Sequence, residues 1–196
     1  MSSVAGEMRS EISRVLYHES TIMSRIDELA SSIAIDYTGK DFTVVAVLNG
    51  SLMFGADLLR RLEMPLRLDC LSVSSYHGAS TTGVVRFHQT KLPDVEGRHV
   101  LLLDDILDSG NTLHAIRDRF LAEAAPLSVK VCVLLSKDVP RQRELEADYV
   151  GFNIGDEFVV GYGLDYMERF RNLPYIGVIN EDAILKYAPA TEPGES

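Results

Sequence analysis

The chain has 196 residues, 46% of them hydrophobic, which is enough for one globular domain whose core needs no metal or disulfide bond. Its 29 acidic and 19 basic side chains give a formal net charge of -10, which argues against a general binder of nucleic acid or anionic membranes. The longest apolar runs, residues 44–48 and 131–135, are far shorter than the ~20 residues of a membrane span. The N-terminus lacks the basic start and apolar stretch of a signal peptide, so we expect a cytoplasmic protein.

Strand and helix patterns alternate along the chain. Apolar residues at helical spacing follow a plausible N-cap at Ser20, and β-branched runs typical of buried parallel strands follow later. The alternation predicts an α/β fold, with a mainly parallel central sheet flanked by helices. The C-terminal third is richer in strand patterns and is expected to add a small lobe. The predicted helices are residues 20–33, 51–62 and 112–124, and the predicted strands are residues 43–48, 66–73, 100–103 and 129–135.

Several details follow from the same patterns. We expect Leu52 and Leu121 to face inward from their helices, and Cys70 and Cys132 to be buried free thiols in strands. The polar segment 74–83 contains two glycines and is long enough to be a mobile lid. Residues 1–196 are expected to form a single domain, and the ends, residues 1–10 and 188–196, to be flexible.

The most informative segment is residues 100–113, VLLLDDILDSGNTL. A short apolar strand leads directly into Asp104 and Asp105, and residues 108–112 form a turn before the next predicted helix. Backbone N–H groups, hydroxyls and a helix N-terminus together make a cradle for a phosphate. The carboxylates would repel a bare phosphate, so their presence indicates a divalent ion or sugar hydroxyls that donate to them. The alternative is a capped helix with three solvated acids.

This segment resembles the 5-phosphoribosyl-1-pyrophosphate (PRPP) motif of the type I phosphoribosyltransferases. Three further segments, in the same order along the chain, resemble the hypoxanthine(-guanine) phosphoribosyltransferases of that family. The resemblance implies the type I fold with a small hood lobe, and the transfer of a phosphoribosyl group from PRPP to a 6-oxopurine with release of pyrophosphate. The segments are the pyrophosphate loop and helix at 48–58, the catalytic loop at 74–76 and 80–82, and the purine-binding segment at 156–166 and 169–175.

The resemblance also implies roles for residues that would bind PRPP. Asp104 and Asp105 would hold the ribose hydroxyls and the water shell of Mg²⁺, and Asn49 and Gly50 would bind the pyrophosphate through backbone amides. Arg171 would supply a cation to the pyrophosphate. The 5′-phosphate would bind Ser109, Gly110, Asn111 and Thr112.

The family's purine-binding and catalytic residues can be placed in the same way. Asp108 would be the general base that faces the imidazole nitrogens of the purine, and Lys137 would donate to its 6-oxo group. Ser75 and Tyr76 would close over the site and exclude water. Phe158 would stack on the purine, and Val159 would meet the edge of the purine. Asp165 would belong both to the purine site and to the site of a second Mg²⁺.

Two positions depart from the family's pattern. Members commonly have Glu-Asp where this chain has Asp104 and Asp105, so the first carboxylate is one methylene shorter. They usually have Lys or Arg where this chain has Asn49, next to a non-proline cis peptide bond. The usual cation could help to bind PRPP, or it could point mainly into a contact between subunits, where Asn would substitute without a kinetic effect.

The substrates and partners expected from the resemblance are PRPP, hypoxanthine or guanine, and pyrophosphate, in a homodimer or homotetramer. Preference among hypoxanthine, guanine and xanthine would depend largely on backbone carbonyls near Val159 and Asp165. The sequence therefore does not rank these three bases as substrates. The alternative is a non-catalytic PRPP sensor that binds RNA or DNA. Such a protein needs a basic face, and the net charge of -10 argues against it.

Overall fold

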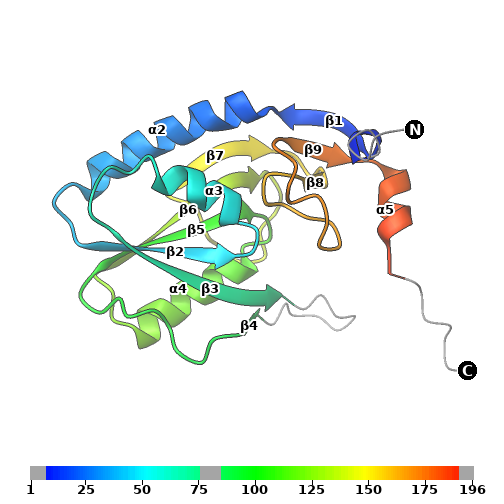
Figure 1. Ribbon diagram of the computed structural model, residues 1–196. Coiled ribbons are helices and arrows are strands. Elements are labelled where there is room, and N and C mark those ends of the chain that lie inside the picture. Colours follow the sequence, from blue (N-terminus) through cyan, green and yellow to red (C-terminus); the bar gives the residue numbers. More distant parts are fainter. Residues whose placement is uncertain (1–7, 76–84, 190–196) are drawn as a thin grey trace, which may run out of the picture. The chain divides into compact units, whose positions relative to one another are not determined.

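The computed structural model describes residues 8–75 and 85–189 (Figure 1). The chain divides into two compact units, one of residues 20–156 and one that combines residues 1–19 with residues 157–196. Residues 1–7 and 190–196, which include most of the ends predicted to be flexible, lie outside the described residues. No helix in the described ranges is both long and apolar enough to cross a membrane.

The unit of residues 20–156 is built on a six-stranded sheet with the order β4-β3-β2-β5-β6-β7. All neighbouring strands are parallel except β4, which pairs antiparallel with β3. Figure 1 shows α2 and α3 on one face of this sheet and α4 on the other, which confirms the predicted α/β class. The strands are β2 (Phe42–Leu48), β3 (Arg67–Ser75), β4 (Val85–Phe87), β5 (His99–Leu107), β6 (Ser128–Lys137) and β7 (Tyr149–Ile154), and the helices are α2 (Glu19–Tyr37), α3 (Leu52–Leu59) and α4 (Asn111–Glu123).

The core of this unit follows the apolar pattern of the sequence. The four apolar side chains spaced along α2 are buried, and the first six residues of β2 are buried as well. A strand that is apolar on both faces belongs in the middle of a parallel sheet covered by helices, which is the position of β2 between β3 and β5. The buried α2 side chains are Ile22, Ile26, Leu29 and Ile33.

Three predictions about side-chain burial were wrong. Leu52 is 55% exposed because the inward face of α3 carries Phe54 and Leu58, and Leu52 lies on another face of the helix. Leu121 is 52% exposed because it is one residue past the buried Phe120, about 100° further around α4. Both cysteines are free as predicted, and Cys132 is buried, but Cys70 is only partly buried.

Three strands extend at least two residues past their predicted ends: β6, which reaches Lys137, and β5 and β3. β5 continues through Asp104 and Asp105 to Leu107, because β6 goes on pairing with it along that length. β3 includes Ser74 and Ser75, which the sequence assigned to the loop, because both residues pair with β4. The acidic pair therefore lies within β5, whereas the sequence placed it directly after the strand.

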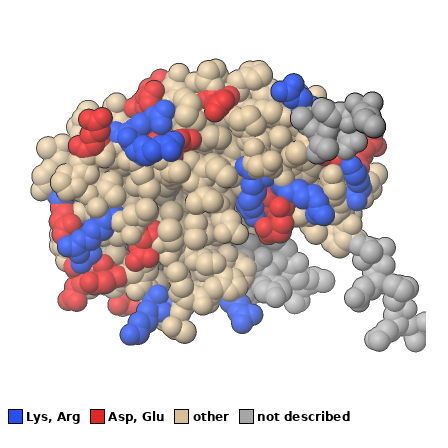
Figure 2. Space-filling model, in the orientation of Figure 1, with Lys and Arg blue, Asp and Glu red and all other residues tan. Residues whose placement is uncertain are grey.

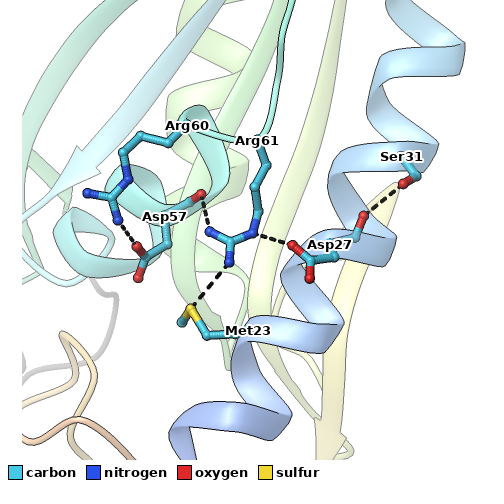
Figure 3. A network of polar contacts seen from close by, with 6 residues as sticks. All are labelled: Met23, Asp27, Ser31, Asp57, Arg60 and Arg61. Atoms are coloured by element: carbon cyan, nitrogen blue, oxygen red, sulfur yellow. Dashed lines mark hydrogen bonds and ion pairs between the residues drawn. The ribbon is translucent and has the colours of Figure 1, made fainter.

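A polar network ties α3 to α2 (Figure 3). Arg61, just past the end of α3, forms an ion pair with Asp27 of α2. Its guanidinium also donates to the backbone oxygen of Asp57 at 3.0 Å and contacts the sulfur of Met23 at 3.5 Å. The network holds the C-terminal end of α3, whose N-terminal end directly follows the loop of residues 49–51.

The second unit contains a three-stranded antiparallel sheet with the order β1-β9-β8 and the short helix α5 (Glu181–Tyr187). Asn180 caps α5, since its side chain accepts a hydrogen bond from the Ala183 N–H at 2.8 Å. Buried Glu11 accepts hydrogen bonds from Lys186 at 2.6 Å and the Tyr187 hydroxyl at 2.9 Å, which joins the two ends of the chain. This unit is the small lobe that the sequence predicted. Its strands are β1 (Ile12–Tyr17), β8 (Val159–Val160) and β9 (Ile176–Ile179).

Candidate functional site

The candidate site of the larger unit lies at the carboxyl ends of its parallel strands. The loop after β2, the turn after β5 and the segments after β6 and β7 all leave the sheet at this edge. In open α/β sheets this is the edge where ligands bind. The predicted PRPP motif and pyrophosphate loop therefore leave neighbouring strands on the same side.

The acidic pair at the end of β5 is largely withdrawn from solvent. Asp104 is buried, and the backbone N–H of Asp105 donates to its carboxylate at 2.9 Å. The Asp105 carboxylate in turn accepts from the N–H of Ile106 at 2.8 Å. Burial first, and then the negative charge of Asp105, raise the pKa of Asp104 well above its usual range. A cation or several hydrogen-bond donors would favour the ionised pair.

The loop after β2 packs directly on this pair. A Cβ atom on Gly50 would lie 1.8 Å from Oδ2 of Asp105, so only glycine permits this approach of backbone and carboxylate. The peptide bond between Leu48 and Asn49 is cis, as the family resemblance implies. The Asn49 side chain is exposed, and the backbone oxygen of this residue accepts from the Leu52 N–H at 3.1 Å.

The loop also contains a residue that sequence reasoning missed. Ser51 is completely buried, and its hydroxyl donates to the backbone oxygen of Val47 at 2.6 Å. This bond joins the start of α3 to the end of β2. A small polar residue directly before an apolar helix was the only signal in the sequence.

The turn between β5 and α4 forms a concave cradle. Residues 104–113 line a cavity of about 320 Å³. Gly110 has φ +81°, a left-handed conformation that favours glycine, and it precedes the first turn of α4. From the sequence, Gly110 was expected to bind a phosphate. The structure adds that the left-handed backbone conformation at this position itself favours glycine.

A second segment supports the cradle and was not predicted. The backbone N–H of Gln142 donates to the oxygen of Ser109 at 3.1 Å, and the Asn111 side chain donates to the Gln142 side chain at 2.7 Å. A Cβ atom on Gly110 would lie 3.0 Å from the backbone oxygen of Arg143. The segment after β6 therefore fixes the position of the predicted phosphate-binding turn.

Lys137 and Asp108 lie together in the structure. Lys137, the last residue of β6, has a side chain that is 11% exposed, and its Nζ lies 3.5 Å from Oδ2 of Asp108. The same Nζ lies 3.4 Å from Oδ1 of Asp156, which follows β7. The sequence singled out Lys137 and Asp108 but gave Asp156 no role of its own, although Asp156 is the first residue of the segment that resembles the family's purine-binding segment.

Arg141 braces the segment that follows Lys137. Its guanidinium donates to the Ser136 hydroxyl at 2.9 Å and to the backbone oxygen of Leu145 at 2.6 Å. Ser136 is buried and directly precedes Lys137 in β6. The bonds of Arg141 therefore connect the residue that precedes Lys137 with the segment that follows it.

The smaller unit carries the other predicted residues. Arg171 lies 2.8 Å from the Asp165 carboxylate, and it also donates to the backbone oxygen of Gly163 at 2.8 Å. Phe158 is 47% exposed and packs edge-on against Tyr166 with ring centroids 5.4 Å apart. Val159 is buried in β8 and pairs with Val178 of β9.

The two remaining site residues are the ones that the family resemblance assigned to the catalytic loop. Ser75 is the last residue of β3, and its backbone pairs with that of Val85. Tyr76 lies outside the described residues.

Comparison with known proteins identifies the family. The family model for the phosphoribosyl transferase domain matches residues 15–167. A hypoxanthine-guanine phosphoribosyltransferase of Streptococcus pneumoniae is 43% identical over 176 residues, which cover 89% of this chain and 97% of the relative.

Solved structures agree with this match. A hypoxanthine phosphoribosyltransferase from Staphylococcus aureus is 40% identical, with a TM-score of 0.85 over 92% of this chain and 98% of the other. A hypoxanthine-guanine phosphoribosyltransferase from Bacillus anthracis is also 40% identical, with a TM-score of 0.80 over 87% of this chain and 98% of the other. The chain belongs to the phosphoribosyl transferase family, among the hypoxanthine-guanine phosphoribosyltransferases.

Proposed function

We propose that this protein acts in purine salvage by transferring the 5-phosphoribosyl group of PRPP to hypoxanthine, and also to guanine, with release of pyrophosphate. The products are the corresponding nucleoside monophosphates, IMP and GMP. The observation that carries the proposal is the pairing of Asp108 with Lys137 beside the cavity of residues 104–113. A proton acceptor and a hydrogen-bond donor are held there at the edge of the sheet where a phosphorylated ligand can bind.

The PRPP-binding part of the proposal uses the loop and the turn described above. We assign the 5′-phosphate to the cradle of residues 109–112, where backbone N–H groups and the start of α4 favour an anion. Asp104 and Asp105 accept hydrogen bonds from the ribose hydroxyls. The backbone of Asn49 and Gly50, which packs on Asp105, binds the pyrophosphate.

Mg²⁺ is the metal we assign to this reaction, since carboxylate oxygens are the ligands it prefers. The described residues form no cluster of three or more His, Cys, Asp or Glu side chains able to hold a metal alone. This suits an ion that keeps much of its water shell and binds through substrate phosphates and one or two carboxylates. We assign Asp104 and Asp105 to one such ion and Asp165 to a second. When bound, the metal neutralises charge on the departing pyrophosphate.

The purine would be bound and activated by side chains of this chain. Lys137 donates to the 6-oxo group, and Asp108 accepts the proton from the imidazole nitrogen, so that a purine N–H bond breaks as the glycosidic bond forms. Losing a general base of this kind usually costs ~10² to 10⁴-fold in rate. Because the ammonium group of Lys137 donates and cannot accept, the 6-amino group of adenine would leave one of its N–H donors unpaired, at a cost of ~1–3 kcal/mol.

Residues of the smaller unit complete the assignments. Phe158 has an exposed ring for stacking on the purine, and we assign the purine edge to the Val159 backbone. Arg171 is assigned to the pyrophosphate. Its guanidinium has five N–H donors, so it can keep Asp165 and still bind an anion. Ser75 and Tyr76 are assigned to the loop that closes over the reacting groups.

We also propose that the protein is a cytoplasmic homodimer or homotetramer. The observation in favour of assembly is the exposed apolar pair Leu52 and Met53 at the start of α3, which are 55% and 38% exposed. Light scattering of the purified protein gives the mass directly. A monomer across the micromolar range would contradict this part of the proposal.

The alternative of a nucleic-acid-binding PRPP sensor has little support. On the face drawn in Figure 2, the described Lys and Arg side chains lie among Asp and Glu, without a continuous basic surface. The net charge is -10. A filter-binding assay at moderate salt separates the two functions.

Steady-state assays with PRPP, Mg²⁺ and each of hypoxanthine, guanine, xanthine and adenine test the proposed function. We expect turnover with hypoxanthine and guanine and a much lower rate with adenine. The rate with xanthine shows how well the pocket accepts an oxygen at the 2-position of the purine. Comparable rates for adenine and hypoxanthine would contradict the role of Lys137, and no PRPP-dependent product with any base would contradict the function.

A further inference from the structure

Lys137 is held by two carboxylates that come from the two neighbouring strands of the sheet. Asp108 follows β5 and Asp156 follows β7, and both strands pair with β6, which ends at Lys137. The Lys137 side chain is 11% exposed, whereas those of Asp108 and Asp156 are 53% and 81% exposed. The ammonium group of Lys137 is therefore contacted from two sides by carboxylates that are themselves largely exposed to solvent.

The two carboxylates have different roles in the proposed reaction. When Asp108 takes the purine proton it becomes neutral, and its attraction for Lys137 weakens. Asp156 takes no part in the proton transfer and stays ionised. Lys137 has a long flexible side chain. A carboxylate at Asp156 that keeps its charge through the reaction would hold the ammonium group in place, so that the N–H not used by Asp108 and Asp156 stays directed at the purine oxygen.

We infer that Asp156 is a positioning residue that acts through Lys137 to select and bind 6-oxopurines. The inference rests on the proposed function and adds a residue to its specificity. The contact is supported by the backbone next to it, because the N–H of Asp138 donates to the oxygen of Ile154 at 2.8 Å. This bond fixes the distance between the chain after β6 and the chain after β7.

The chain offers a matched control for Asp156. Asp138 is also exposed and lies next to Lys137 in sequence, and within the described part of the chain its carboxylate forms no ion pair. Asp156→Ala and Asp138→Ala therefore remove the same charge near the same lysine. Only the first removes a group that contacts Nζ.

The experiment compares these variants with the unmodified protein in hypoxanthine- and PRPP-dependent kinetics. Because the Asp156 carboxylate is mostly exposed, we expect Asp156→Ala to raise the KM for hypoxanthine about two- to fivefold. The KM for PRPP and the rate with adenine should stay the same, so the preference for hypoxanthine over adenine falls by the same factor. Asp156→Glu should restore part of the effect, and Asp138→Ala should cause none.

A double-variant comparison separates positioning from a general structural effect. In a Lys137→Ala background, Asp156→Ala should cause no further rise in the KM for hypoxanthine. An additional rise there, an equal rise in the KM for PRPP, or an unchanged KM in the single variant would overturn the inference. If the unmodified protein makes no IMP, the proposed function itself fails, which is a different result from an active enzyme that is indifferent to Asp156.

Discussion

Gly50→Ala tests the contact between the loop after β2 and the acidic pair of β5. The added methyl carbon would lie 1.8 Å from Oδ2 and 2.4 Å from Cγ of Asp105, distances that real Cβ atoms do not show. Asp105 has to rotate away, and its Oδ1 then leaves the Ile106 N–H that it accepts from at 2.8 Å. Overpacking of this kind costs ~1–3 kcal/mol, which for a chain of this size lowers Tm by roughly 2–12 °C.

The same variant should also bind PRPP more weakly. A displaced Asp105 no longer accepts from a ribose hydroxyl, so we expect the KM for PRPP to rise about tenfold. Thermal melting and steady-state kinetics measure the two effects. Gly39→Ala is the control for a simple loss of glycine, because at Gly39 no atom lies within 4 Å of an added Cβ. That variant has its own backbone cost, at φ +73°, but should keep the KM for PRPP.

A second substitution shows whether the collision is the cause. Gly50→Ala combined with Asp105→Ala should melt at the temperature of Asp105→Ala alone, because the clashing carboxylate is gone. Gly50→Ala with unchanged Tm and unchanged KM for PRPP would refute the close approach. A double variant that melts well below Asp105→Ala alone would show that the cost of the added methyl group lies elsewhere.

Three further predictions concern single side chains of the site. Asp108→Asn should keep PRPP binding and lower turnover by roughly two orders of magnitude, and near-normal turnover would remove Asp108 from the mechanism. Asn49→Lys should tighten Mg·PRPP binding several-fold in calorimetric titration, because it adds a cation beside a multiply charged ligand, while equal affinities would assign Asn49 to packing or assembly. Asp104→Asn should lower activity yet raise Tm relative to the unmodified protein. Burial raises the folded-state pKa of Asp104 above its unfolded value, so its contribution to stability is present at low pH and is lost as pH rises from about 4 towards the folded pKa. The Tm difference between Asp104→Asn and the unmodified protein should therefore widen as pH rises, and a constant difference would contradict the burial effect.

The sequence predicted the parts of the fold that local patterns determine. Helical spacing placed Ile22 and Ile33 in the core, and a β-branched run located the central strand β2. The end of β5 was missed because Asp104 and Asp105 interrupt the apolar pattern, and only the partner β6 shows that pairing continues past them. Pairing between distant segments is not visible in a local run of residues.

In the candidate site, too, local sequence patterns predicted some features, whereas contacts between distant segments were not predicted. The turn of residues 108–112 was recognisable because its residue types lie next to one another in sequence. Gln142 reaches the site from a segment whose composition is ordinary, so nothing local marks it. Asp156 lies in a recognisable segment, but its contact with Lys137 depends on the pairing of β6 with β7. The roles of Gly50 and Ser51 likewise depend on what packs against them, Asp105 in one case and the end of β2 in the other.

Product analysis of a single reaction tests the central claim most directly. Purified protein is incubated with PRPP, hypoxanthine and Mg²⁺, and the IMP and pyrophosphate are quantified together by chromatography. If the enzyme transfers the phosphoribosyl group to the purine, one IMP and one pyrophosphate appear for each PRPP consumed, and omitting hypoxanthine abolishes both. Pyrophosphate without IMP, or PRPP left intact, would contradict the claim.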